Sequence, residues 1–344
     1  MKNGYLTLRY GASNLIDRVE MSKNRMFLLK IETDSPKRLK SCVKDLSWLW
    51  HMRFGHLNFG SLKELAKENM VNDLPLIDLP NQLCEGCLYG KQSQKSFPKE
   101  ASWRATKPLQ LVHADVCGPF TPVSLGQSKY FLLFIDDFSR KTWVYFLKEK
   151  SEVFGAFQKF KAFVEKESGA SIKALRSDRG GEFTSNKFEQ FCEANGIRHF
   201  LTVPMTPQQN GVVERKNRTI LNMARSMLKS KKMPKEFWAE AVSCAVYLSN
   251  LSPTISVPGK TPQEAWTSRK PNVSHLRVFG SIAYAHVPDE KRSKLDEKSE
   301  KYVFIGYDLR SKGYKLYSPA TKKVIISRDV MFNEEGSWDW NVVK

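Results

Sequence analysis

The sequence predicts an α/β protein whose central domain is a mixed five-stranded sheet with flanking helices. Three stretches rich in β-branched and aromatic residues follow one another through short polar connections, which indicates an antiparallel meander. Stretches that alternate between strand and helix patterns come next, and this order is typical of a mixed sheet covered by helices. Short strand-like stretches separated by turn signals follow and predict a second, small β-barrel domain.

The first part of the chain differs from the central domain. Residues 1–45 contain alternating apolar residues at Tyr5–Leu8 and at Met26–Leu29. Alternation of this kind is typical of strands, so we expect an N-terminal β-rich extension.

Residues 46–100 predict a small helical domain. The run Ser61-Leu62-Lys63-Glu64 has the form of a capping box, which predicts a helix that continues to about Asn69. Residues 81–99 are turn-rich and basic.

Residues 108–255 carry the central domain. Its strands are expected at residues 109–116, 130–135, 142–147, 172–176 and 197–202. Its helices are expected from Ser151 to Gly169, and at about 186–194, 210–231 and 235–250. Apolar residues recur at helical spacing in the first of these helices, and glycine is the residue that most often ends a helix.

A proline-containing connector at residues 256–275 leads into the predicted β domain at residues 276–336. Strands of that domain are expected at residues 278–287, 302–307, 314–317 and 324–332. The charged run from 289 to 301 mixes both signs, so we expect a solvated loop there.

Composition points to a folded protein that meets a polyanion. The 344 residues include 55 Lys and Arg against 36 Asp and Glu, a formal net charge of +19, and the 41% of hydrophobic residues excludes wholesale disorder. This charge favours nucleic acid as the partner. No apolar run approaches the ~18 residues of a membrane span, and the start lacks the apolar region of a secretory signal. We therefore expect neither a membrane partner nor secretion.

Two histidines and a Cys-x2-Cys pair have the spacing of a metal site. His51 and His56 are separated by four residues, and Cys84 and Cys87 follow within the same 37-residue stretch. Two imidazoles and two thiolates suit a closed, tetrahedral zinc site of the structural kind. The alternative is two surface histidines beside a chance cysteine pair.

Three carboxylates stand where regular elements begin or end. Asp115 ends the first core strand, Asp178 follows the fourth, and Glu214 lies near the start of the long helix. Converging carboxylates repel one another unless cations neutralise them, and such hard oxygen ligands suit Mg²⁺ or Mn²⁺. Two ions ~3.5–4 Å apart are able to clamp the attacking and leaving oxygens of a phosphoryl transfer.

The spacing of the carboxylates sharpens this hypothesis. Asp178 and Glu214 are separated by 35 residues. A D…D-x35-E pattern on this order of elements resembles the ribonuclease-H-like integrase core of retroviruses and retrotransposons. Several motifs are similar to the integrase region of copia-type LTR-retrotransposon Pol polyproteins: LWHMRFGHLNFGSL, CEGCLYGKQ, HADVCGPF, RSDRGGEF and TPQQNGVVERKNRTILNMARSML. The resemblance covers nearly the whole chain.

This resemblance implies a zinc-binding pre-integrase domain at 46–100, an integrase core at about 108–255 and an SH3-like domain at about 276–336. It assigns one structural Zn²⁺ to His51, His56, Cys84 and Cys87, and two Mg²⁺ or Mn²⁺ ions to the catalytic residues Asp115, Asp178 and Glu214.

The implied activity is that of a DDE-type polynucleotidyl transferase. It joins element DNA ends to target DNA by strand transfer, and has a latent endonuclease activity that trims 3′ ends. The implied partners are element DNA, target DNA and further copies of the chain, in the nucleus after a cytoplasmic particle stage. The chain is then expected to be a segment of a polyprotein, because it carries no aspartic protease signature.

A basic stretch begins beside the proposed catalytic site. Such runs are usually solvated faces, but this position favours contact with the DNA backbone. The residues expected to bind DNA are Arg215, Lys216, Arg218, Arg225, Lys229, Lys231 and Lys232.

Some residues and functions keep a second interpretation. His113 shares a strand face with Asp115, and a hydrogen-bonded structural role is favoured over a proton shuttle. Glu182 is expected to orient a loop, and the pair Asp136-Asp137 to occupy a meander turn. Two other functions stay open: a ribonuclease-H-like nuclease, and a catalytically silent relic or domesticated nucleic-acid-binding protein.

Overall fold

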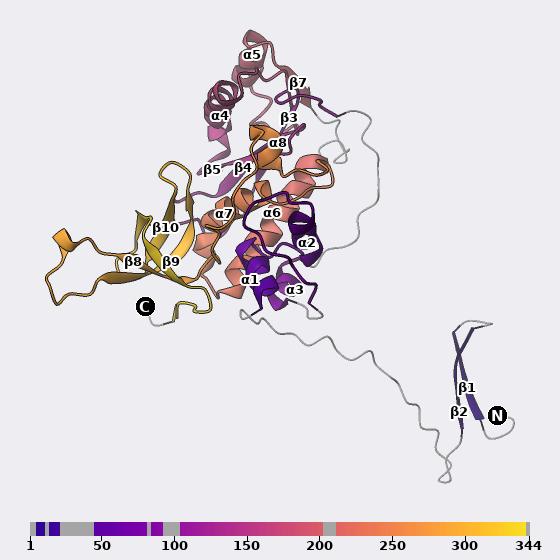
Figure 1. Cartoon of the computed structure of the whole chain (residues 1–344). Helices are drawn as coiled ribbons and strands as arrows, with labels where there is room; N and C mark the ends of the chain where they lie inside the picture. The colour runs from indigo at the N-terminus through magenta and orange to yellow at the C-terminus, as the bar shows by residue number, and fades with distance from the viewer. Residues whose placement is uncertain are drawn as a thin grey trace. The chain divides into compact units, whose positions relative to one another are not determined.

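The computed structural model describes residues 5–10, 14–20, 45–80, 84–91, 104–201 and 211–341 (Figure 1). A first unit, within residues 1–38, contains an antiparallel pair of strands, β1 (Tyr5–Tyr10) and β2 (Asn14–Glu20). The strand expected at Tyr5–Leu8 is thereby confirmed, whereas the one expected at Met26–Leu29 lies outside the described residues.

The central sheet has five strands in the order β5-β4-β3-β6-β7. The strands β3 (Val112–Cys117), β4 (Tyr130–Asp136) and β5 (Thr142–Leu147) form the expected antiparallel meander. The strands β6 (Ala174–Ser177) and β7 (Arg198–Leu201) run parallel to β3. The predicted mixed five-stranded sheet is therefore confirmed.

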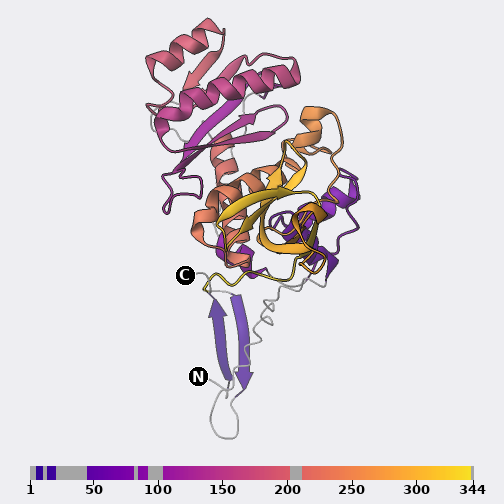
Figure 2. The same cartoon turned by 90° about the vertical axis from the view of Figure 1, so that its left-hand side faces the viewer.

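Helices cover both faces of this sheet (Figure 2). On one face, α4 (Val153–Ser168) and α5 (Asn186–Ala194) pack against Leu132 and Phe134, and the Phe134 ring stacks on Phe160 at 4.1 Å between centroids. On the other face lie α6 (Gly211–Ser230) and α7 (Trp238–Asn250). A 3-10 turn, η1 (Lys150–Glu152), leads into α4, and η3 (Lys235–Phe237) leads into α7. None of the described helices has the length and apolar character of a membrane span.

Three short helices precede the sheet: α1 (Leu46–Arg53), α2 (Phe59–Lys67) and α3 (Glu85–Lys91). The capping box expected at Ser61 is wrong, because α2 begins two residues earlier. Its N-cap is Asn58, whose side-chain oxygen accepts a hydrogen bond from the Ser61 amide at 2.8 Å. The helix α3 lies within the stretch 81–99, whose sequence is turn-rich.

The connector contains α8 (Pro262–Thr267), which begins at the N-cap Thr261, and this helix was not expected. An antiparallel five-stranded sheet then follows in the order β11-β10-β9-β8-β12. Its strands are β8 (Ile282–His286), β9 (Ser299–Asp308), β10 (Gly313–Ser318), β11 (Lys323–Ser327) and β12 (Val330–Asn333).

The single strand expected at 324–332 is thus two strands, which pair with opposite edges of this sheet: β11 with β10, and β12 with β8. The charged run at 289–301 contains a 3-10 turn, η4 (Asp289–Lys291), and the start of β9.

The three domains of the second unit share one hydrophobic core. Trp50 and Phe54 of the α1 region, Met223 of α6, Leu248 of α7 and Ile305 of β9 belong to the same buried cluster. A Cβ at Gly55 would lie 3.0 Å from Leu248 Cδ1, so the helical module touches α7 directly. Folding of residues 45–91 is therefore tied to the two larger domains.

Candidate functional site

Asp115 stands in the middle of the central sheet, on β3, where α6 crosses it. Its side chain is half-buried, and Oδ2 accepts a hydrogen bond from Asn217 Nδ2 at 2.6 Å. Asn217 is three residues after Glu214 on α6, so the two side chains lie on one side of that helix. The sequence reading missed Asn217, although its position one turn after the glutamate was a usable signal.

The other two carboxylates come from neighbouring elements. Asp178 directly follows β6, which pairs with β3 in parallel, and its Oδ1 accepts a hydrogen bond from the Gly180 amide at 3.1 Å. Glu214 is exposed in the first turn of α6. The three carboxylates come from two adjacent strands and the helix that covers them, near enough for the charges of Asp178 and Glu214 to act on Asp115.

The pKa of Asp115 reports this convergence. Burial, followed by the negative charges of Asp178 and Glu214, raises the pKa of Asp115 to about 7. A carboxylate set that resists ionisation in this way favours a bound divalent cation, because the cation removes the repulsion that raises the pKa. The donor set, oxygen atoms alone, fits Mg²⁺ or Mn²⁺.

His113 takes a structural position on β3. It is buried, and its Nε2 lies 2.9 Å from Asp137 Oδ1, which also lies 2.8 Å from Arg140 Nη1. Burial opposes the ionisation of Asp137, but the hydrogen bonds from His113 and the Ala105 amide, together with the Arg140 charge, lower its pKa to about 2. The favoured interpretation of His113, a hydrogen-bonded structural residue, agrees with this network.

The neighbouring acids are also engaged by the fold. Asp136 is fully buried and accepts hydrogen bonds from the Leu109 amide and from Ser139, so the Asp136-Asp137 pair belongs to a meander turn as expected. Glu182 forms an ion pair with Lys150 at 2.9 Å, which ties the loop after β6 to η1.

The His and Cys residues converge as their spacing predicts. One donor atom from each of His51, His56, Cys84 and Cys87 lies within 4.8 Å of the other three. His56 Nδ1 is 3.2 Å from Cys84 Sγ, and His51 Nε2 is 3.5 Å from Cys87 Sγ. Tetrahedral zinc with Zn–N of ~2.0–2.1 Å and Zn–S of ~2.3 Å needs ligands roughly 3.3–3.8 Å apart, so the site fits this ion.

Hydrogen bonds and burial favour the protonation states in which these side chains bind a metal. His51 Nδ1 lies 2.6 Å from the Leu57 carbonyl oxygen, and donation to this oxygen leaves Nε2 free as the ligand. Burial lowers the pKa of His56 to about 4, which keeps its imidazole neutral. Hydrogen bonds from Cys87, His51 and His56 lower the pKa of Cys84, which favours its thiolate.

Backbone shape brings the two halves of this cluster together. Gly55 and His56 both have left-handed φ angles, +59° and +63°, so the chain turns back sharply after α1. Gly90 of α3 faces α6 so closely that a Cβ there would lie 3.0 Å from the Ser226 amide nitrogen. The helix α3, which carries Cys87, therefore packs against α6 near Ser226. Glu214 lies at the opposite end of α6, in its first turn.

The seven predicted DNA-binding residues divide into two groups. Five are exposed: Arg215, Arg218, Arg225, Lys229 and Lys232. The other two, Lys216 and Lys231, are held by the fold, and the ammonium of the partly buried Lys216 donates to Ser249 Oγ. Lys231 is 5% exposed, and its ammonium donates to the carbonyl oxygens of Glu334 at 2.7 Å and Gly336 at 3.0 Å. The expectation that Lys231 contacts DNA is therefore wrong, because its donors are satisfied inside the fold.

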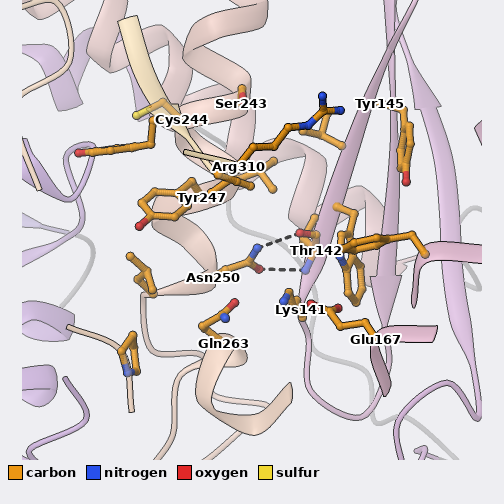
Figure 3. Close-up of a pocket in the computed structure, with 18 of the residues that line it drawn as sticks. Lys141, Thr142, Tyr145, Glu167, Ser243, Cys244, Tyr247, Asn250, Gln263 and Arg310 are labelled. Carbon is orange, nitrogen blue, oxygen red and sulfur yellow. Dashed lines mark hydrogen bonds between the residues drawn. The ribbon is translucent and has the colours of Figure 1, made fainter. Parts of the chain in front are cut away.

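A cavity of about 750 Å³ lies away from both clusters, between β5, α4, α7 and the end of β9 (Figure 3). Asn250 of α7 fixes one wall: its Oδ1 accepts from the Thr142 amide at 2.9 Å, and its Nδ2 donates to the Thr142 carbonyl at 2.8 Å. Lys141 stands beside them and lies 5.4 Å from the ring centre of Trp143. None of the predicted site residues lines this cavity.

Comparison with protein families gives three matches along the chain. Residues 25–92 match the GAG-pre-integrase domain, residues 105–207 the integrase core domain, and residues 281–344 the retroviral polymerase SH3-like domain. Asp115 and Asp178 lie within the integrase core match, and Glu214 lies beyond its end.

Two curated relatives are plant transposon proteins. The retrovirus-related Pol polyprotein from transposon TNT 1-94 of Nicotiana tabacum is 51% identical over 286 residues, which is 83% of this chain and 21% of that protein. The Pol polyprotein from transposon RE2 of Arabidopsis thaliana is 34% identical over 296 residues, 85% of this chain and 20% of that protein. The chain thus spans about a fifth of the length of these relatives.

A solved structure of the HTLV-2 integrase catalytic core domain in complex with magnesium is also similar. Its TM-score is 0.37 at 22% identity, and the match covers 47% of this chain and 99% of that one.

Proposed function

Because the chain belongs to the integrase region of copia-type retrotransposon Pol polyproteins, we propose that it joins DNA ends of the element to target DNA by strand transfer. The observation that carries this proposal is the convergence of Asp115, Asp178 and Glu214: burial of Asp115, together with the charges of the other two carboxylates, raises the pKa of Asp115 to about 7. Such a set of carboxylates suits metal-dependent phosphoryl transfer.

Asp115, Asp178 and Glu214 would hold two Mg²⁺ or Mn²⁺ ions, which would stabilise negative charge on the attacking and leaving oxygens of the exchange. In that exchange a 3′-hydroxyl oxygen gives up its proton to water and forms a bond to the target phosphorus. The bond from that phosphorus to its own 3′-oxygen breaks, and the departing 3′-oxygen takes up a proton from water. Asn217 holds the Asp115 carboxylate by its hydrogen bond at 2.6 Å, and β3 and α6 fix the distance between their acidic residues. Water in place of the 3′-hydroxyl would give the latent endonuclease that trims the ends.

The DNA backbone is proposed to lie along the exposed cations of α6 and the turn after it. Arg215 and Arg218 are nearest to Glu214, and Lys229 and Lys232 lie at the far end of the helix. Binding through phosphates predicts that log affinity falls roughly linearly with log salt. We propose that further copies of the chain assemble on the DNA, and that the protein acts in the nucleus after a cytoplasmic particle stage.

The zinc cluster is proposed to serve as scaffold, since all four ligands of a tetrahedral ion come from the protein: His51, His56, Cys84 and Cys87. A closed set of this kind leaves no position for substrate. Its contribution to the reaction is the placement of α3 on α6.

The test is a Mg²⁺-dependent joining assay with oligonucleotides that match the ends of the element. Glu214→Gln keeps the side-chain volume but removes one charge, so joining is expected to fall by several orders of magnitude while duplex binding survives. The matched control is Glu182→Gln, whose carboxylate pairs with Lys150, and which is expected to retain joining. Joined products near the wild-type level from Glu214→Gln would refute the assignment, and cleavage without joining would select a nuclease.

A further inference from the structure

Lys141 is a buried lysine in the wall of the cavity between β5, α4, α7 and the end of β9 (Figure 3). It is 8% exposed, and its ammonium has no hydrogen bond or ion pair with any of the described residues. Its neighbours are two indole rings, whose centres lie 5.4 Å (Trp143) and 5.5 Å (Trp266) from Nζ. Burial lowers the pKa of Lys141, and the charge of Glu167 opposes this shift. A charged group that has lost its water calls for an acceptor, and the rings supply only part of that.

The fold does not satisfy Lys141 as it satisfies a comparable lysine. Lys231, which is equally buried, donates to the carbonyl oxygen of Glu334 at 2.7 Å. Glu167, whose charge reaches Lys141, makes no ion pair with it and instead accepts a hydrogen bond from Trp266 Nε1 at 2.8 Å. Among the described residues, none supplies the acceptor that the Lys141 ammonium lacks.

The other walls of the cavity suit an apolar group. Tyr145 of β5 and Leu251 after α7 line it. Two further lining side chains are exposed to solvent, Phe163 of α4 at 53% and Leu309 after β9 at 75%. The cavity volume of about 750 Å³ lies within the roughly 300–1,000 Å³ of small-molecule sites. Exposed apolar side chains around a hollow of this size are typical of a binding site.

Hydrogen bonds and ring contacts fix these walls. Asn250 of α7 holds Thr142 through two hydrogen bonds, and Thr142 is the residue next to Lys141. The ring of Tyr247 lies 4.7 Å from the ring of Tyr307, the residue by which β9 reaches the cavity. A ligand therefore has little wall to reorganise, which favours its binding.

The charges of the cavity favour an anion. Of the residues that line it, Lys141 and Arg310 are cations, and Glu167 is the one carboxylate. Figure 3 shows Lys141 near Glu167 and Gln263 at one end of the cavity, and Arg310 toward the other end. A carboxylate is balanced by a single ammonium, whereas a phosphate dianion needs several donors in one place. One buried ammonium beside apolar walls thus matches a carboxylate on an apolar group.

We propose that this cavity binds a carboxylate carried by an apolar or aromatic group, with the Lys141 ammonium as its donor and with Trp143 and Phe163 beside its apolar part. The carboxylate belongs either to a free organic acid or to an acidic side chain of a partner protein, and both present the same chemistry. The site goes beyond strand transfer, because it uses none of the residues proposed to hold metal or DNA. Its walls come from the integrase core and from the SH3-like sheet, so a bound ligand would hold these two domains together.

The experiment titrates the full chain by calorimetry with hydrocinnamate and with its neutral amide, hydrocinnamamide. The acid is expected to bind at least about tenfold more tightly, since only the carboxylate is a charged acceptor for Lys141. Lys141→Met keeps an apolar stem and removes the charge, and it is expected to bind the acid and the amide alike. The matched control is Lys159→Met, an exposed lysine on α4, which is expected to keep the wild-type preference.

A second variant and a second pair of probes complete the test. Phe163→Ala changes an exposed side chain, so it locates the site even if Lys141→Met does not fold, and it is expected to weaken the acid and the amide together by roughly threefold. The peptides acetyl-Phe-Glu-Phe-amide and acetyl-Phe-Gln-Phe-amide separate the two sources. A preference for the Glu peptide that Lys141→Met removes identifies a partner protein, whereas the same result with hydrocinnamate alone identifies a free acid.

Two outcomes would overturn the site. The first is absent or equal binding of the charged and neutral members of both probe pairs by the wild type. The second is a preference for the carboxylate that survives in a folded Lys141→Met, or wild-type affinities in Phe163→Ala. None of these measurements needs DNA or joining, so the site and the proposed strand transfer fail separately.

Discussion

Replacing Cys84 with serine tests whether the zinc module folds independently. Zinc contributes roughly 10–16 kcal/mol of apparent binding free energy in small zinc-finger peptides, whereas a whole domain is stable by only about 5–15 kcal/mol. Loss of the proposed zinc ion would therefore remove an amount comparable to the total stability of a domain. The buried Trp50 and Phe54 belong to the same cluster as Met223 and Leu248, so the module cannot detach without opening that cluster.

We therefore expect Cys84→Ser to destabilise the second unit as a whole. For a net loss of about 5 kcal/mol, the melting temperature should fall by roughly 10–20 °C, in a single transition. Calorimetry measures the transition, and elemental analysis of the purified protein measures its zinc. The matched control is Cys192→Ser in α5, which buries the same hydroxyl away from the metal ligands. A zinc-free Cys84→Ser protein whose main transition stays at the wild-type temperature would refute the shared-core reasoning.

Three other substitutions test separate features. Gly90→Ala pushes a methyl group to 3.0 Å from the Ser226 amide nitrogen, so chemical denaturation should show a loss of about 1–3 kcal/mol; wild-type stability would contradict it. The pKa of Asp137 is lowered from 3.8 to about 2, so the ionised carboxylate stabilises the fold by about 2 kcal/mol above pH 4. This stabilisation is lost as the pH falls through 2 and the carboxylate is protonated. Asp137→Asn should remove that acid dependence, and an unchanged pH profile of unfolding would contradict it. Lys231→Met leaves the Glu334 and Gly336 carbonyl oxygens without their donor and should cost about 1–3 kcal/mol, with no change in the salt slope of DNA binding.

Elements with strong local patterns were predictable from the sequence. The strand β5 and the helix α5 have the expected bounds, because an aromatic-rich run between polar turns and an apolar stripe at helical spacing each determine one structure. The left-handed φ of +69° at Gly169 ends α4 as glycine allows. The His and Cys cluster was equally predictable, since the chain offers few such donors and four of them fall in one short stretch.

Features that depend on distant partners were not predictable. The helix α3 contains two glycines and reads as a turn, but Gly90 is what allows its close packing on Ser226 of α6. Lys231 reads as part of a basic run, but its ammonium meets the Glu334 carbonyl, 103 residues away. Asn58 outcompetes Ser61 as the N-cap of α2, and both have suitable side chains, so local chemistry alone did not decide between them.

The long helix α6 has a consequence for how this chain is able to diverge. Its 20 residues span about 30 Å. Along that length it presents Glu214 towards Asp115 and Asp178, Ser226 to α3 and Met223 to the core shared with β9. A recombination event that replaced one domain with that of a distant relative would have to match several faces of α6 at once. The pre-integrase module, the catalytic core and the SH3-like sheet are therefore expected to be inherited as a block, with compensating changes along this helix.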